Sequence, residues 1–106
     1  MIDFNDFKKI EMKVGTIEKI EEISNSDKLI KLKVNVGGEV KQAIAGIKKH
    51  YKSQELEGKQ FVFVTNLQPA KLMGELSEVM ILAAVDAGNV VLIKPEKEIK
   101  NGSQLE

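Results

Sequence analysis

The chain has 106 residues, of which 42% are hydrophobic and 30% charged, which predicts one soluble domain over residues 1–106 with a single modest core. It has no cysteine, no apolar run near the roughly 18 residues of a membrane span and no secretory signal at its start, so we expect a cytoplasmic protein. Sixteen basic and sixteen acidic residues give no formal net charge, so binding to a nucleic acid requires that the positive charge gather on one face.

Hydrophobic spacing and turn residues predict the elements at the start of the chain. Apolar residues spaced by three predict a helical turn over residues 3–10, with Asn5 as its N-cap. Alternating β-branched residues then predict a curved strand over residues 12–23, with a bulge at Gly15. The sequence S-N-S-D that follows is typical of a turn.

The middle of the chain contains the clearest alternation of apolar and polar residues. It predicts a strand over residues 28–36, a two-residue turn at Gly37 and Gly38, and a return strand over residues 39–45. Residues 46–51 are predicted to form a short helix, and residues 53–56 a turn.

Three further strands are expected in the second half. Residues 60–66 are apolar on both faces, which is typical of a central strand, and residues 79–85 and 90–94 form two more, joined by a turn at D-A-G-N. The polar tail from Pro95 onward is expected to be frayed.

Five or six short strands at this spacing, with a helix between the third and the fourth, predict an all-β fold. The order is that of the OB-fold, a five-stranded Greek-key barrel whose second and third strands and rim loops form the usual binding face. The alternating second strand and its return strand therefore become the first place to look for a binding site.

The residues that catalysis or metal binding would need are scarce. His50 is the single histidine, set among lysines, which is more typical of a solvated residue or a phosphate contact than of a general base. No cysteine or second histidine is available to hold a metal, and no glycine-rich phosphate loop is present. We expect a non-catalytic protein without a cofactor.

Lysines and uncharged polar residues on the predicted binding face indicate a phosphate-binding groove. The lysines are expected to share one face of the second and third strands, beside a rim that follows the fourth strand. The alternatives are a solvated strand face and an ordinary hairpin connection. The lysines are Lys31, Lys33 and Lys41, and the rim residues are Asn66, Gln68 and Ser77.

Aromatic residues are few, with four Phe and one Tyr. Stacking on bases would have to come from Tyr51 or Met80. This scarcity favours recognition of the shape of a folded RNA over binding of any single strand.

Five blocks of sequence, in order over residues 7–93, resemble the tRNA-binding domain family. The blocks are M-K-V-G-T-I-E-K-I-E-E, D-K-L-I-K-L-K-V-N-V-G, A-G-I-K-K-H-Y, N-L-Q-P-A-K-L-M-G and S-E-V-M-I-L-A-A. This family occurs as a domain or small (beta) subunit of methionyl-tRNA synthetases and as free-standing homodimeric tRNA-binding proteins. It also includes a chaperone-like branch.

The resemblance implies an OB barrel that recognises tRNA by shape, alone or as a subunit of methionyl-tRNA synthetase. It assigns tRNA contacts to the residues that match the family's blocks, and it implies a homodimer. The apolar N-terminal turn and the late strands are the candidate dimer contacts; the alternative is that they cap the barrel of a monomer. The matching residues are Asn66, Lys71, Ser77 and Met80 in the fourth and fifth blocks, and Lys31 and Lys33 in the second.

One departure from the family concerns the fifth block. The family commonly has S-x-G-M where this chain has S-E-V-M, with Val79 in place of glycine. Valine removes backbone freedom and adds bulk beside Ser77 and Met80. We therefore expect either a weaker affinity for tRNA or the binding of a different partner at these residues. The alternative function is therefore a chaperone-like or protein-interaction module of the same fold.

Overall fold

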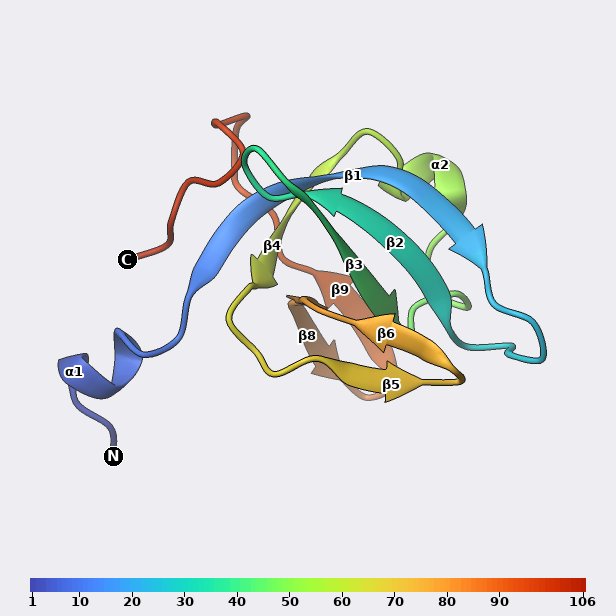
Figure 1. Cartoon of the computed structure of the whole chain (residues 1–106), viewed down its shortest axis with the longest axis horizontal. Coiled ribbons are helices and arrows are strands. Elements are labelled where there is room, and N and C mark those ends of the chain that lie inside the picture. The colour runs from blue at the N-terminus through green and yellow to red at the C-terminus, as the bar shows by residue number, and fades with distance from the viewer.

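The computed structural model describes all 106 residues and consists of strands with two one-turn helices (Figure 1). Neither helix has the length and apolar character needed to cross a membrane. The elements, in chain order, are α1 (Phe4–Phe7), β1 (Met12–Glu22), β2 (Ile30–Asn35), β3 (Val40–Ala45), α2 (Ser53–Leu56), β4 (Gln60–Val64), β5 (Ala70–Leu72), β6 (Glu75–Ser77), β7 (Met80–Ile81), β8 (Ala83–Asp86) and β9 (Asn89–Leu92).

Five antiparallel strands form a nearly closed barrel in the order β3-β2-β1-β4-β7. The two end strands approach each other, and the Glu78 amide donates a hydrogen bond of 2.7 Å to the Gln42 carbonyl across the gap. The hairpin of β5 and β6 and the hairpin of β8 and β9 are separate two-stranded sheets beside this barrel. The predicted all-β, OB-like fold is confirmed.

The barrel is filled by the inward-facing side chains of the predicted strands. In β2, Ile30, Leu32 and Val34 are buried while the residues between them are half-buried, as strand alternation requires. In β4 all four residues 61–64 are buried, which confirms its prediction as a central strand. Figure 1 shows the long β1 curving across the barrel and joining these strands.

The predicted bulge lies three residues further along β1 than expected. The pairing of β1 with β2 shifts register between Ile17 and Lys19, and Gly15 is regularly paired with Phe61 of β4. Gly15 is instead required by a close approach of strands. A Cβ atom there would lie 2.8 Å from Val34 Cγ1 and 3.0 Å from the Asn35 carbonyl oxygen.

We expect Gly15→Ala to lower the free energy of unfolding by about 1–3 kcal/mol, because an overpacked barrel must shift β2. Gly46→Ala is the matched control, since its new Cβ would meet only Leu29 Cδ2 at 3.8 Å. Urea denaturation of the two variants checks this prediction. Equal stabilities of the two variants would contradict it.

Both helices begin at residues other than those predicted. Asp3, and not Asn5, is the N-cap of α1, where its carboxylate accepts the Asp6 amide at 2.9 Å. The helix between β3 and β4 is α2, whereas residues 46–51 form turns and not the predicted helix. Leu56, the last residue of α2, is fully buried and anchors this helix to the core.

The second half of the chain differs from the prediction in three ways. The predicted strand over 79–85 is divided into β7 and β8, because the Leu82 amide and carbonyl bond to Val62 and Ile93 respectively. Residues 70–77 form the unpredicted hairpin of β5 and β6. The tail is paired and not frayed, since Val14 donates to the Ser103 carbonyl at 2.9 Å and Leu105 to that of Met12 at 2.9 Å.

Candidate nucleic-acid interface

The outer face of β2 and β3 carries two of the three predicted lysines. Lys31 lies opposite Ile44, and Lys33 opposite Gln42, whereas Lys41 lies opposite the buried Val34. Because directly opposed residues place their side chains on the same face of a sheet, Lys41 does not share the face of the other two. The prediction of one common lysine face was wrong. The two-residue turn between β2 and β3 fixes this register.

Lys31 is held between two carboxylates. Its amine lies 2.8 Å from Glu75 of β6 and 3.7 Å from Glu21 of β1. The hydrogen bond to Glu75 raises the pKa of Lys31 above its ordinary value, so this lysine stays charged. Its charge is nevertheless compensated locally by these two carboxylates. Lys31 ties the hairpin of β5 and β6 to the barrel.

Lys33 keeps an uncompensated positive charge on the same face. Its amine donates to the Gln42 side-chain oxygen at 2.5 Å and forms no ion pair. The Gln42 amide group in turn donates to the Leu76 carbonyl at 2.8 Å, which fixes the position of both side chains beside β6. A neutral partner orients the Lys33 amine and leaves its charge available to a phosphate.

Ser77 closes the barrel. Its hydroxyl accepts the Ile44 amide at 3.0 Å and donates to the Val79 carbonyl at 3.2 Å. Glu78 adds a second link, since its carboxylate accepts the Gln42 amide at 3.0 Å. The geometry therefore gives Ser77 a structural task at the seam between β3 and β7, and the predicted contact of Ser77 with RNA stays a prediction.

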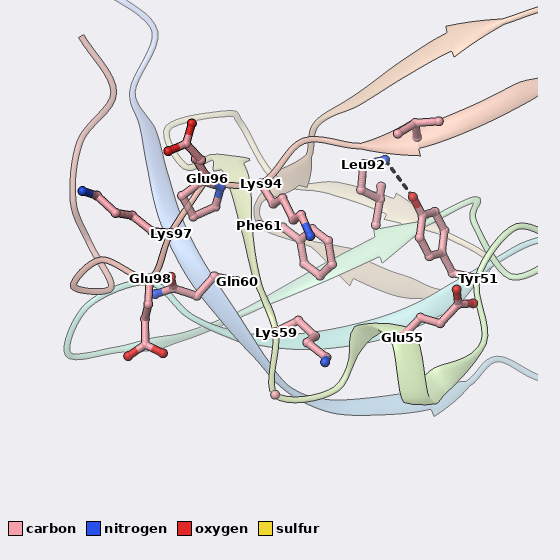
Figure 2. Close-up of a pocket in the computed structure, with 13 residues that line it drawn as sticks. Tyr51, Glu55, Lys59, Gln60, Phe61, Leu92, Lys94, Glu96, Lys97 and Glu98 are labelled. Carbon is pink, nitrogen blue, oxygen red and sulfur yellow. Dashed lines mark hydrogen bonds between the residues drawn. The ribbon is translucent and has the colours of Figure 1, made fainter.

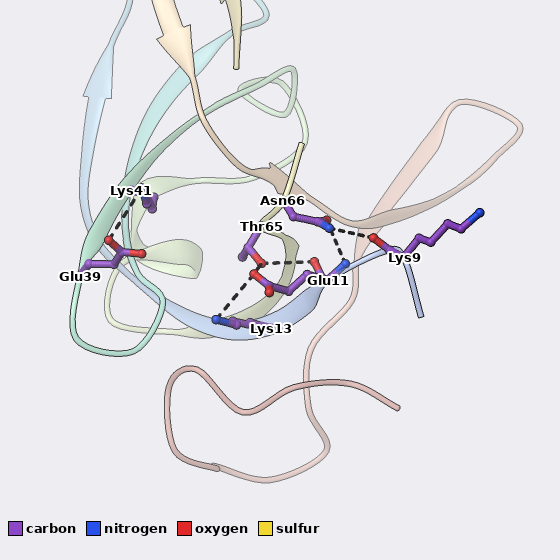
Figure 3. Close-up of polar contacts among 7 residues, drawn as sticks. All are labelled: Lys9, Glu11, Lys13, Glu39, Lys41, Thr65 and Asn66. Atoms are coloured by element: carbon purple, nitrogen blue, oxygen red, sulfur yellow. Dashed lines mark hydrogen bonds and ion pairs between the residues drawn. The ribbon is translucent and has the colours of Figure 1, made fainter. Parts of the chain in front are cut away.

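Asn66 fixes the N-terminal segment to the end of β4, as Figure 3 shows. Its side-chain oxygen accepts the Glu11 amide at 2.9 Å, and its side-chain nitrogen donates to the Lys9 carbonyl at 2.7 Å. Both ends of the amide are thus engaged within the chain. Figure 3 also places Lys41 away from this cluster, with its amine 3.8 Å from Glu39.

The Thr65 hydroxyl donates to the Glu11 carboxylate at 2.7 Å, and this hydrogen bond lowers the pKa of Glu11. A lowered pKa stabilises the fold above the ordinary glutamate pKa of about 4.3, and that stabilisation is lost as the pH falls through the lowered value. We expect the difference in melting temperature between the unaltered chain and Thr65→Val to shrink as the pH falls below about 4.3. Calorimetry between neutral and acid pH checks this, and a difference independent of pH would contradict it.

Met80 lines an apolar cleft of about 280 Å³ at the base of the hairpin, and Lys71 lies on β5 between two residues that line it. Lys71 lies on β5 opposite Leu76, is exposed, and forms no ion pair. Met80 is 46% exposed and lines the cleft. Val79 is only 2% exposed and belongs to the core cluster, so the bulk that replaces the family glycine is accommodated inside the barrel.

A further group of lysines forms a basic rim at one end of the barrel. The Lys48 amide donates to the Lys28 carbonyl at 3.1 Å, which brings the β1–β2 loop beside the β3–α2 loop. Lys48 pairs with Glu22 at 3.5 Å, but Lys28, Lys49 and Lys52 are exposed and form no ion pair. The run K-K-H-Y-K over residues 48–52 is basic in the sequence itself. Its proximity to Lys28, however, depends on the tertiary fold.

Six of the sixteen lysines thus form ion pairs, and the chain has no arginine. The positive charge available on β2, on the hairpin and at the rim comes from five lysines without a carboxylate partner. We call these five residues the open lysines: Lys28, Lys33, Lys49, Lys52 and Lys71. They make the candidate nucleic-acid interface.

Comparison with known proteins identifies the family of the chain. The chain is 50% identical over 105 residues to the methionine–tRNA ligase of Methanococcus aeolicus, with 99% of the chain covered. It spans only 14% to 16% of the length of the curated methionine–tRNA ligases that it matches.

Two solved structures match the whole chain. One is a MetRS related protein from Pyrococcus horikoshii, with a TM-score of 0.94, 39% identity, and coverage of 100% of this chain and 98% of that one. The other is the chaperone CsaA of Bacillus anthracis, with a TM-score of 0.89, 36% identity, and coverage of 100% and 99%. The family model described as "Putative tRNA binding domain" matches residues 12–104. The chain belongs to this tRNA-binding domain family.

Proposed function

We propose that the chain binds tRNA without catalysing a reaction, and that the open lysines contact the phosphate backbone. The observation that carries the proposal is that these five amines have no carboxylate partner in a chain whose formal net charge is zero. Of the residues singled out in the sequence, Lys33, Lys71 and Met80 contact the RNA. Lys31, Asn66 and Ser77 hold the elements that present them, and Lys41 takes part from the edge of β3.

The proposed mode of recognition is by shape. Arginine, whose planar side chain makes the commonest specific base contact, is absent from the chain. Lysine binds phosphate as a point charge, which positions an RNA without reading its bases. The chain therefore tracks the backbone of a folded tRNA with little regard for its sequence.

We further propose that the chain acts in the cytoplasm as a homodimer, alone or beside a methionyl-tRNA synthetase. Helix α1 has no buried residue, and its Phe4 is 67% exposed. In the hairpin of β8 and β9, Val85 is 71% exposed and Val91 56%. A second copy would cover these apolar surfaces, and two copies would present two sets of open lysines to one RNA.

A salt titration of tRNA binding tests the proposal. We expect a gel shift with total tRNA at low salt, and affinity that falls steeply and log-linearly as salt rises, because each phosphate contact releases counterions. Sizing of the free protein reports the homodimer independently. Absence of binding at low salt, or an affinity that does not change with salt, would contradict tRNA binding.

The apolar cleft beside Met80 favours a second candidate function, the binding of an apolar peptide. Leu67, Leu72 and Met80 are each more than 40% exposed around it, and the similar protein from Bacillus anthracis is described as a chaperone. Under this alternative, a fluorescent apolar peptide binds the unaltered chain, and its affinity falls in Met80→Asp but not in Lys33→Ala. Under the tRNA proposal, Lys33→Ala weakens the binding of tRNA, and this loss with unchanged peptide binding tells the two functions apart.

A further inference from the structure

A second cleft has an aromatic wall, and none of the open lysines is among its lining residues. It is a cleft of about 590 Å³ between the end of the β3–α2 loop, the start of β4 and the segment after β9. This volume is in the range of small-molecule sites, about 300–1,000 Å³. None of its three lysines forms an ion pair, although carboxylates also line it. The pocket therefore suits a ligand that can use both kinds of charge.

The wall of the pocket is rigid. The Tyr51 hydroxyl accepts the Leu92 amide at 3.0 Å, which fixes the aromatic ring against β9. Phe61 and Leu92 belong to the core and are nearly buried. Gln60 is fully engaged, since its side chain bonds to both the amide and the carbonyl of Ile99. An apolar wall held in place in this way suits a planar or ring-shaped group.

Two of the three amines of the pocket lie between its carboxylates. Figure 2 shows the amines of Lys59 and Lys94 between Tyr51 and Glu55 on one side and the group of Glu96, Lys97 and Glu98 on the other. Glu55 already accepts the Lys52 amide with one oxygen, at 2.8 Å. The side of the pocket near Tyr51 therefore offers two amines without an ion pair and one partly engaged carboxylate.

Two amines match the charge of a phosphomonoester, about −1.5 to −2 at neutral pH. The free oxygen of Glu55 can accept hydrogen bonds from ribose hydroxyls, as an acidic residue does in dinucleotide-binding folds. The carboxylates of Glu96 and Glu98, on the other side of the pocket, would repel the additional phosphates of a di- or triphosphate. We propose that this pocket binds a nucleoside monophosphate, free or at the 5′-phosphorylated end of an RNA strand, separately from the tRNA-binding face.

The test is a titration of isotope-labelled protein with AMP, followed by amide NMR shifts. We expect saturable shifts at the Leu92 and Phe61 amides, and weaker binding of adenosine and of inorganic phosphate, each by about tenfold or more, because each offers only part of the ligand. Lys59→Gln with Lys94→Gln should weaken AMP binding by about tenfold or more. Lys8→Gln with Lys100→Gln removes the same charge outside the pocket and outside the open lysines, and should leave AMP binding unchanged.

A short RNA with and without a 5′-phosphate distinguishes the two sources of the ligand. Binding that requires the phosphate assigns the pocket to an RNA end, and binding of AMP alone assigns it to a free nucleotide. Non-saturable shifts, shifts outside the pocket, or equal affinities of the two double variants would overturn the proposal. Failure of one proposal is distinguishable from failure of the other, because AMP binding is measured without tRNA and none of the open lysines lines the pocket.

Discussion

Val79→Gly is expected to lower the free energy of unfolding by about 2–4 kcal/mol, through reduced burial, a cavity, and the entropy of glycine in the unfolded chain. Val79 is 2% exposed and packs in the main core cluster, next to the seam that Ser77 and Glu78 close. Urea denaturation measures this decrease. We expect the folded variant to retain tRNA affinity, because the valine side chain points into the core and not toward the open lysines.

Val40→Gly is the matched control for this change. Val40 lies on β3 and is 52% exposed, so its replacement removes much less buried surface and should cost about 1 kcal/mol. If Val79→Gly proved as stable as the control and also bound tRNA more tightly, valine would be acting at the binding site. Its assignment to the core would then be wrong.

The largest effect on binding is expected from Lys33→Ala combined with Lys71→Ala. Without these two amines, tRNA binding at low salt should weaken by about 10- to 100-fold. The slope of log affinity against log salt should also become shallower by about 0.7–0.9 for each phosphate that is no longer neutralised. The decrease should be similar for different tRNAs, because these lysines contact the backbone.

Two comparisons separate this effect from a general removal of charge. Lys8→Ala with Lys100→Ala removes two lysines that form no ion pair and lie outside the candidate interface, and should leave the slope nearly unchanged. Lys31→Ala removes an amine already compensated by Glu21 and Glu75, and should act mainly on the stability of the hairpin. Equal slopes for all three proteins would mean that the interface lies elsewhere.

Local patterns predicted those parts of the fold that depend on neighbouring residues. Alternation identified β2, the glycine pair identified its turn, and the continuous apolar run identified the central β4. The hairpin of β5 and β6 was missed because its strands have only three residues each, and its turn places Met73 in a positive-φ conformation that is uncommon for a side-chain-bearing residue.

The site was predicted less well because its side chains act across long separations in the chain. Ser77 bonds to a residue 33 positions away, and Asn66 to residues 55 and 57 positions away. No local pattern shows that these polar groups are occupied within the fold. The three lysines were expected to share one face, although the two-residue turn sets the register of β2 and β3 and so places Lys41 on the other face.

The central claim is that the open lysines meet the RNA, and lysine footprinting tests it most directly. Every fixed positive side chain of the protein is a lysine, so acetylation with and without tRNA, read by mass spectrometry, surveys all of them. We predict that tRNA protects Lys28, Lys33, Lys49, Lys52 and Lys71, while Lys8 and Lys100 remain reactive. Unchanged labelling of Lys33 and Lys71 in the presence of bound tRNA would contradict the claim.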